Sequence, residues 1–177
     1  MPGTEDRIDK MGYQEHKQQA PRSVNCAVVI ISDTRTEQSD QSGKLIMTAL
    51  KKNGHRVMSY SILKNDADSV AGKLGELLNE EDLQVIITSG GTGIGRRDIT
   101  IETVLPILEK KLDGFGELFR FLTYQEIGTG SIMSRAMAGV ARGKVIICLP
   151  GSAGAVDLAV ERIILPEIGH LVREATR

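Results

Sequence analysis

Three runs of apolar residues constrain the fold of this chain more than any other feature. They read VNCAVVII over residues 24–31, LQVIITS over 83–89 and KVIICLPGS over 144–152. None of them alternates strictly between polar and apolar residues, so each predicts a strand that is buried on both faces, as in a parallel sheet. Segments with helical spacing separate the runs. The sequence therefore predicts an α/β fold, a three-layer α/β/α sandwich with a mostly parallel central sheet.

The segment between the first two apolar runs predicts a helix, a strand and a second helix. Asp40 or Ser42 can cap the first helix. The weaker run RVMSYSIL, residues 56–63, predicts the strand. Asp66 or Asp68 can cap the second helix. The apolar residues of this second helix recur at helical spacing: Val70, Leu74, Leu77 and Leu78.

Prolines divide the helices that are predicted after the second apolar run. Thr100 is the expected N-cap of a helix that kinks or restarts at Pro106, because proline removes a backbone donor inside a helix. Pro166 interrupts the closing helix for the same reason. The remaining predictions are a helix over 116–125, a loop over 127–135 and the closing helix over 155–172.

Length and terminal composition predict one domain with a tail. The chain has 177 residues, enough for one ordinary domain. Residues 1–23 are polar and aperiodic, which indicates a flexible tail, so the domain is expected to span 24–177. The N-terminus has no apolar core of signal-peptide type, and the longest apolar runs are far short of a membrane span, so we expect a cytoplasmic protein with no membrane partner.

The overall balance of residues excludes several classes of function. A net charge of -1 and an aromatic content of 3% argue against a nucleic-acid surface. The three histidines have no zinc-ligand spacing to cysteine or to one another. The two cysteines, Cys26 and Cys148, each lie inside a predicted strand, and we expect both to be buried, reduced thiols.

Three polar loops follow predicted strands and share a composition rich in Gly, Ser, Thr and Asp. They span residues 32–43, 89–100 and 150–155. Ligands of α/β sheets normally bind beyond the carboxyl ends of the strands. The convergence of these three loops therefore predicts a binding site at that edge of the sheet.

The second of these loops, SGGTGIGRRDIT, favours an anion without matching either standard phosphate loop. Arg96 and Arg97 stand where a Walker A loop has Lys and Ser or Thr, and the glycines are one residue short of the dinucleotide fingerprint. Successive backbone N–H groups without side chains nevertheless suit an anion. The simpler alternative is a tight turn whose glycines allow positive φ.

Two aspartates are candidate metal ligands beside this loop. Asp98 next to a bound phosphate makes sense with a divalent cation between them, which favours Mg²⁺, or as an ordinary helix cap. Asp66 follows another strand at the same edge and could supply a second carboxylate, or serve only as a cap. Arg96 and Arg97 are either solvated charges or phosphate ligands.

Several of these motifs together resemble the MoaB/MogA type of molybdenum cofactor biosynthesis proteins. The resemblance extends from about Val24 to the C-terminus and also includes the similar G domain of plant and animal molybdopterin-inserting proteins. The motifs are SDT near the first strand, DQSG, TSGGTG followed by RRDIT, GFGELFR, the SR of SIMSRAMAG, and LPGS.

The resemblance implies the family's three-layer fold and assembly as trimers, or as hexamers of two trimers. It also implies an activity, because active members transfer AMP from Mg-ATP to the terminal phosphate of molybdopterin and release pyrophosphate. Mg²⁺ is then the expected cofactor, ATP and molybdopterin are the substrates, and the molybdate-inserting protein is a further partner. Some MoaB-type members bind the pterin without adenylylating it, so a non-catalytic molybdopterin-binding or scaffold protein is the alternative.

The resemblance also implies site residues. The family's essential aspartate matches Asp98 and its other important aspartate matches Asp66, and both are expected to be catalytic and to hold the metal. The residues expected to bind pterin or nucleotide are Ser89, Gly90, Gly91, Thr92, Gly93, Thr100, Ser131, Ser134, Arg135, Pro150, Gly151 and Ser152.

Overall fold

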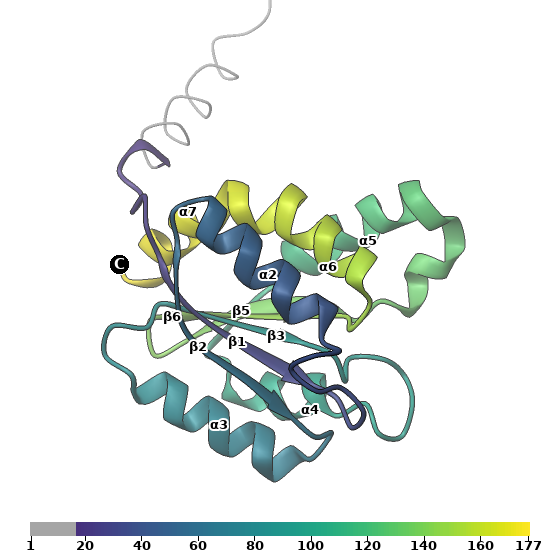
Figure 1. The fold of residues 1–177 in the computed structure, drawn as a ribbon. Coiled ribbons are helices and arrows are strands. Elements are labelled where there is room, and N and C mark those ends of the chain that lie inside the picture. The colour runs from purple at the N-terminus through teal and green to yellow at the C-terminus, as the bar shows by residue number, and fades with distance from the viewer. Residues whose placement is uncertain (1–16) are drawn as a thin grey trace, which may run out of the picture.

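Six strands form a single mixed sheet in the order β2-β1-β3-β6-β5-β4 (Figure 1). The structure is a computed structural model that describes residues 17–177. Strands β2, β1, β3 and β6 are parallel, and β5 runs antiparallel to both of its neighbours. The predicted α/β fold with a mostly parallel sheet is confirmed. The strands are β1 (Asn25–Ile31), β2 (Arg56–Leu63), β3 (Val85–Ser89), β4 (Lys110–Leu112), β5 (Met137–Ala141) and β6 (Lys144–Leu149).

Helices cover both faces of this sheet, as Figure 1 shows. Helices α2, α5, α6 and α7 pack on one face, and α3 and α4 pack on the other. The α-helices are α2 (Gln41–Lys52), α3 (Ala67–Asn79), α4 (Thr100–Val104), α5 (Asp113–Ile127), α6 (Ala153–Ala159) and α7 (Leu165–Ala175). Shorter helical segments are the 3₁₀ turns η1 (Leu105–Ile107) and η2 (Gly128–Met133) and the π-helical η3 (Val160–Ile164).

Burial on both faces explains why the central strands are continuously apolar. Successive side chains of a strand point to opposite faces, and in β1 the two sets enter two different hydrophobic clusters. Each large apolar side chain buried in this way stabilises the fold by about 1.5–3 kcal/mol. One cluster contains Cys26, Val28 and Ile30, and the other contains Ala27, Val29 and Ile31.

Both cysteines are buried and free, as predicted. Burial raises the pKa of the Cys26 and Cys148 thiols to about 12, so neither is a nucleophile near neutral pH. Within residues 17–177 no helix is both long and apolar enough to cross a membrane.

Strands β4 and β5 were not predicted from the sequence. Strand β5 is short, contains Gly139, and joins β6 through the two residues Arg142 and Gly143. Both of these residues have positive φ, 51° and 71°, as in a type I′ hairpin turn. Arg-Gly is a weaker sequence signal for such a turn than Asn-Gly, so the hairpin was not expected. Gly139 allows β4 to approach closely, because a Cβ there would lie 2.6 Å from the carbonyl oxygen of Lys110.

Two of the predicted helix caps are confirmed and one is wrong. The carboxylate of Asp40 accepts a hydrogen bond from the Gly43 amide at the start of α2, and Asp66 caps α3. Thr100 is the first residue of α4 and not its N-cap, a position that Ile99 occupies without a side-chain hydrogen bond. The Thr100 hydroxyl donates instead to the carbonyl oxygen of Gly90, 2.8 Å away, because α4 begins directly against the glycine loop.

The later segments differ from the prediction in two places. The helix predicted over TIETVLPILEKK, residues 100–111, ends in η1, and Lys110–Leu112 form strand β4. Pro106 lies in η1, directly after α4 ends, and Pro166 lies in the first turn of α7, after the π-helical turn η3. The segment predicted as a loop over 127–135 instead contains the 3₁₀ turn η2. It begins at Gly128, whose φ of 68° ends α5.

Most of the predicted N-terminal tail, residues 1–16, lies outside the described residues. The part that the structure describes contacts the domain. Lys17 forms an ion pair with Glu167, the hydroxyl of Ser23 donates to the carbonyl oxygen of Gly54, and the carbonyl oxygen of Pro21 lies close to Gly169. The division into a tail and a single domain over 24–177 stays a prediction.

Candidate functional site

A cleft of about 460 Å³ lies at the carboxyl ends of β1, β3 and β6. The three polar loops predicted to converge there do so, and a fourth segment from the end of η2 joins them. The lining residues are Ile31, Ser32, Thr34, Arg35, Asn65, Gly90, Gly91, Thr92, Gly93, Asp98, Met133, Ser134, Arg135, Pro150, Gly151 and Ser152.

Ten of the residues predicted as site residues line this cleft, and four do not. The ten are Gly90, Gly91, Thr92, Gly93, Asp98, Ser134, Arg135, Pro150, Gly151 and Ser152. Ser89 and Thr100 are buried next to the cleft and bind its loops, Ser131 is buried in η2, and Asp66 is exposed at the start of α3. Of these four residues, Ser89 and Thr100 support the loops of the cleft, and Ser131 and Asp66 do not line it.

The glycines of the loop are required by backbone conformation and by close contacts. Gly90 and Gly91 have φ values of 105° and 63°, in the region that favours glycine. A Cβ on Gly90 would lie 2.2 Å from the carbonyl oxygen of Ile31, and a Cβ on Gly93 would lie 2.7 Å from the carboxylate of Asp98. The first pair of glycines therefore shapes the turn, and Gly93 makes room for Asp98.

Asp98 is half-buried and closes the second part of the loop. Its Oδ2 accepts a hydrogen bond from the Gly95 amide at 2.8 Å, and its own amide donates to the Gly95 carbonyl oxygen at 3.0 Å. Asp98 is therefore not a helix cap, and its carboxylate lies at the wall of the cleft.

The second predicted carboxylate does not reach the cleft. Oδ1 of Asp66 accepts from the Ser69 amide at 2.8 Å, and the hydrogen bond from Ser69 lowers the pKa of the Asp66 carboxyl. The residue before it, Asn65, lines the cleft instead. Asp66 was predicted because of its charge, but the neighbouring Asn65, two residues after the end of β2, is the one that enters the cleft.

Asn65 presents a buried oxygen that has no hydrogen-bond partner among the described residues. Asp33 fixes its orientation, because the Asp33 carboxylate accepts from the Asn65 amide nitrogen at 3.1 Å and from Nδ2 at 2.9 Å. These hydrogen bonds, helped by the Arg97 guanidinium 2.7 Å away, lower the pKa of the Asp33 carboxyl. Oδ1 of Asn65 is thereby directed to the glycine loop, 2.7 Å from where a Cβ of Gly91 would be.

Partly buried hydrogen bonds position the turn after β6. The Arg35 guanidinium donates to the carbonyl oxygen of Gly151 and, at 3.1 Å, to the hydroxyl of Ser42, which itself donates to Gly151 at 2.9 Å. Ser89 donates to the carbonyl oxygen of Pro150 at 2.9 Å. Arg35 was missed as an individual site residue, although the loop that contains it was predicted.

Arg135 connects the fourth segment to the glycine loop. Its guanidinium donates to the carbonyl oxygen of Gly93 at 3.3 Å and forms an ion pair with Glu102 in α4. This ion pair lowers the pKa of the Glu102 carboxyl, chiefly through the hydrogen bond from Arg135. Of the two loop arginines weighed from the sequence, Arg97 pairs with Asp33, and neither lines the cleft.

The backbone polarity of the cleft favours an anion. Five carbonyl oxygens of its loops, those of Gly90, Gly91, Gly93, Pro150 and Gly151, already accept hydrogen bonds from Thr100, Arg135, Ser89 or Arg35. The amide N–H groups of Gly91, Thr92 and Gly93 donate to no other residue within 17–177. Unpaired N–H groups next to two guanidinium groups are the arrangement that binds phosphate oxygens.

The oxygen ligands in the cleft suit a Mg²⁺ ion that is also bound by phosphates. Across residues 17–177 no group of three or more His, Cys, Asp or Glu side chains could hold a metal ion. The carboxylate of Asp98 and the unpartnered Oδ1 of Asn65 are hard oxygen ligands. Mg²⁺ is usually bound by one or two such groups together with substrate phosphates and water, so the set suits a metal–nucleotide complex.

Comparisons with known proteins agree on one family. Residues 27–170 match the family described as "Probable molybdopterin binding domain". The chain is 48% identical over 168 residues to molybdenum cofactor biosynthesis protein B of Bacillus cereus, covering 94% of this chain and 99% of that protein.

Solved structures show the same relationship. A crystal structure of a molybdenum cofactor biosynthesis protein B superposes with a TM-score of 0.85 at 49% identity, over 89% of this chain and 98% of the other. The tungsten cofactor synthesizing protein MoaB from Pyrococcus furiosus superposes with a TM-score of 0.82 at 38% identity, over 89% of this chain and all of that one.

Proposed function

This chain belongs to the MoaB/MogA family of molybdenum cofactor biosynthesis proteins, and from that premise we propose that it is a cytoplasmic molybdopterin adenylyltransferase. The observation that carries the proposal is the cleft wall in which unpaired amides of residues 91–93 adjoin the carboxylate of Asp98. This combination of anion-binding amides and a metal-binding acid suits a Mg-nucleotide.

In the proposed reaction, an oxygen of the molybdopterin phosphate forms a bond to the α-phosphorus of ATP. The bond from that phosphorus to the oxygen bridging the α- and β-phosphates breaks, and pyrophosphate leaves with the electron pair. Such transfers need aligned phosphates and neutralised charge more than covalent participation by the protein. The molybdate- or tungstate-inserting protein would then receive the adenylylated pterin.

Each group of the cleft has a role in this proposal. The amides of Gly91, Thr92 and Gly93 hold phosphate oxygens in line, and Arg35 and Arg135 offset their negative charge. Asp98 and Asn65 would hold Mg²⁺. Mg²⁺, when bound with ATP, supplies further neutralisation of the charge on the phosphate oxygens. The supporting hydrogen bonds of Ser89 and Thr100 keep the loops in place before substrate arrives.

One observation favours a second candidate, a non-catalytic protein that binds or carries molybdopterin. Asp66 caps α3 outside the cleft, so Asp98 is the only carboxylate in the cleft lining among residues 17–177. A pterin carrier needs the anion-binding loop and does not need to hold a metal.

A product assay distinguishes these two candidates. Purified protein incubated with molybdopterin and Mg-ATP is expected to produce adenylylated pterin and one pyrophosphate per product molecule. Chromatography detects the adenylylated pterin, and a coupled enzymatic assay measures pyrophosphate. An active homologue treated in parallel controls for substrate quality. Tight pterin binding without either product, while the homologue turns over, would support the carrier and contradict the transferase.

Self-association is proposed from exposed apolar side chains on α5 and η2. Phe121, Ile127 and Ile132 are large apolar side chains that are 58%, 64% and 80% exposed. They support the trimer, or hexamer of two trimers, that the family resemblance implies. Leu118 of α5 and Met133 of η2 are also exposed.

The substitution Phe121→Glu is expected to reduce the mass of the particle at micromolar concentration from that of an oligomer to that of a monomer. A charge placed in an apolar contact is left buried and unpaired. Light scattering coupled to gel filtration measures this mass. Met58→Glu is a matched control, because Met58 is a similarly exposed apolar residue on β2, away from α5 and η2. A monomeric wild-type protein would contradict the proposal.

A further inference from the structure

A cavity of about 260 Å³ lies at the amino edge of the sheet, at the other end of the strands from the cleft. Residues 17–22, the turn between α2 and β2, and the first turns of α7 line it. Figure 1 shows the purple segment from residue 17 onward beside α7, and a Cβ on Gly169 would lie 2.5 Å from the carbonyl oxygen of Pro21. The length of β1 therefore separates this cavity from the cleft.

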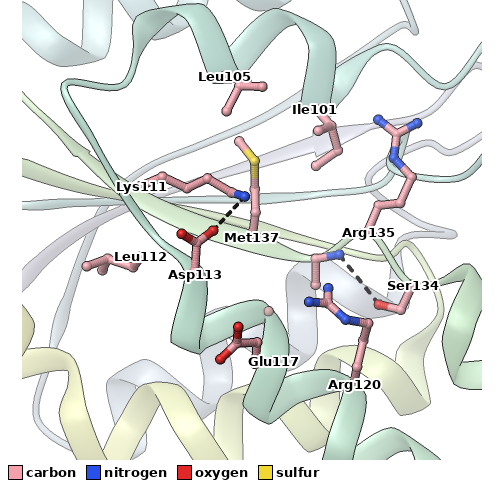
Figure 2. Close-up of a pocket in the computed structure, with 12 residues that line it drawn as sticks. Ile101, Leu105, Lys111, Leu112, Asp113, Glu117, Arg120, Ser134, Arg135 and Met137 are labelled. Atoms are coloured by element: carbon pink, nitrogen blue, oxygen red, sulfur yellow. Dashed lines mark hydrogen bonds and ion pairs between the residues drawn. The ribbon is translucent and has the colours of Figure 1, made fainter.

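The titratable side chains that line this cavity are all basic. They are Lys17, Arg22, His55 and His170. No Asp or Glu of residues 17–177 belongs to the lining. The cavity in Figure 2, which shares Ser134 and Arg135 with the cleft, differs because Asp113 and Glu117 line it. A lining with basic groups and without carboxylates favours an anion.

His55 presents a ring N–H to the cavity. The residue is only 9% exposed, and its Nδ1 accepts a hydrogen bond from the Val24 amide at 3.3 Å. Burial lowers the pKa of the imidazole, so near neutral pH the ring is neutral and its one proton lies on Nε2. Nε2 has no partner within residues 17–177 and is not fully enclosed, so it opens on the cavity that the ring lines.

Arg22 supplies the positive charge. Its side chain is exposed, and its guanidinium forms no hydrogen bond or ion pair within residues 17–177. The charges of the two other basic groups are partly compensated, because Glu167 pairs with Lys17 at 2.7 Å and with His170 at 3.1 Å. The Arg22 guanidinium and the His55 N–H are therefore the groups that can bind a ligand directly.

Apolar side chains form another part of the lining. They come from Leu165, Pro166 and Ile168 at the start of α7. The volume of the cavity lies below the roughly 300–1,000 Å³ of sites for drug-sized ligands, so only a small molecule fits. Inorganic phosphate would contact the donors and leave the apolar wall in contact with water. A phosphate that carries a small organic group would cover both.

We propose that this cavity binds a small phosphate monoester. The phosphate oxygens accept hydrogen bonds from Nε2 of His55 and from the Arg22 guanidinium, and the organic group covers the apolar wall. A monoester carries close to two negative charges near neutral pH, and guanidinium groups pair well with such phosphates. The bound ligand joins residues 17–22 to α7 and thereby fixes the segment that leads into β1. The site does not depend on the proposed transferase activity.

Phenyl phosphate is the probe, and the ring signals of His55 and His170 in NMR spectra of the full-length, histidine-labelled protein at constant pH are the readout. No histidine of residues 17–177 lines the cleft, so these signals report on the cavity and not on phosphate in the cleft. Phenyl phosphate is expected to shift both signals saturably, with a dissociation constant of about 1 mM or below. Inorganic phosphate should bind at least about 5-fold more weakly, because it leaves the apolar wall uncovered.

His55→Asn separates binding of the ligand from the structural hydrogen bond. The Asn Oδ1 can replace Nδ1 as the acceptor for the Val24 amide, but no group replaces the Nε2–H donor. This variant is expected to bind phenyl phosphate about 10-fold more weakly, as read from His170. Arg22→Gln removes the charge at an exposed position and is expected to weaken binding about 10-fold without changing urea unfolding.

Arg56→Gln is the matched control, because Arg56 is an exposed arginine at the start of β2 that does not line the cavity. It should leave the affinity unchanged. The absence of a saturable shift of the histidine signals at about 10 mM phenyl phosphate overturns the proposal. So does an unchanged affinity in Arg22→Gln. Inorganic phosphate that binds as tightly as phenyl phosphate overturns the monoester and identifies free phosphate as the ligand.

Discussion

Asp98→Asn is expected to lower the rate of AMP transfer on the order of 100-fold or more while leaving the fold intact. The substitution removes the negative charge that would hold Mg²⁺ against the phosphates. It keeps an oxygen that can still accept from the Gly95 amide, so the loop retains its hydrogen bond. Pyrophosphate release under saturating Mg-ATP and molybdopterin measures the rate, and urea unfolding measures stability.

Asp66→Asn is the comparison that makes this result specific. Asp66 carries the same charge at the same end of the sheet but only caps α3. Asn is also a good cap, so the Asp66 variant should retain most of its activity. If the two variants lost activity equally, the assignment of the metal to Asp98 and Asn65 would be incorrect. Full activity of Asp98→Asn would refute the role of Asp98.

Gly90→Ala is expected to reduce the free energy of unfolding by roughly 3 kcal/mol or more. The added methyl group would lie 2.2 Å from the carbonyl oxygen of Ile31, and the neighbour is backbone that cannot rotate away. The φ of 105° is also outside the range that alanine prefers. Urea unfolding followed by circular dichroism measures the change.

Gly54→Ala separates the two causes. Gly54 also has a positive φ, 81°, but a Cβ there would have nothing within 4 Å. Its substitution should therefore show the conformational strain alone, about 1 kcal/mol. A loss at Gly90 no larger than that at Gly54 would mean that the loop moves away from Ile31 without difficulty, and that the glycine loop is not rigid.

The parts of the fold that could be predicted are those with a strong local signal. Strands β1, β3 and β6 are buried on both faces, so their apolar runs are unbroken. Strand β5 was missed because its run contains Gly139 and pairs with only three residues of β4. Its pairing with β6 follows a two-residue turn, Arg142-Gly143, whose sequence is only a weak signal for a hairpin.

The site was predicted at the level of loops better than at the level of atoms. The carboxyl edge of the sheet and the glycine loop followed from topology, and Asp98 followed from charge beside an anion site. Asn65 and Arg35 were not named, because an amide and a loop arginine carry no distinctive signal in one sequence. Asp66 and Asn65 are adjacent, and only the geometry of the strand end decides which one enters the cleft.

The occupied carbonyl oxygens of the cleft have a consequence for the order in which ligands arrive. Gly90, Gly91, Gly93, Pro150 and Gly151 all have their carbonyl oxygens engaged by donors from the protein itself. These five backbone oxygens are therefore less available to replace the water shell of a bare cation. We therefore expect the cleft to bind free Mg²⁺ weakly and to bind Mg²⁺ that is already coordinated by a polyphosphate. Metal and nucleotide would then enter as one complex.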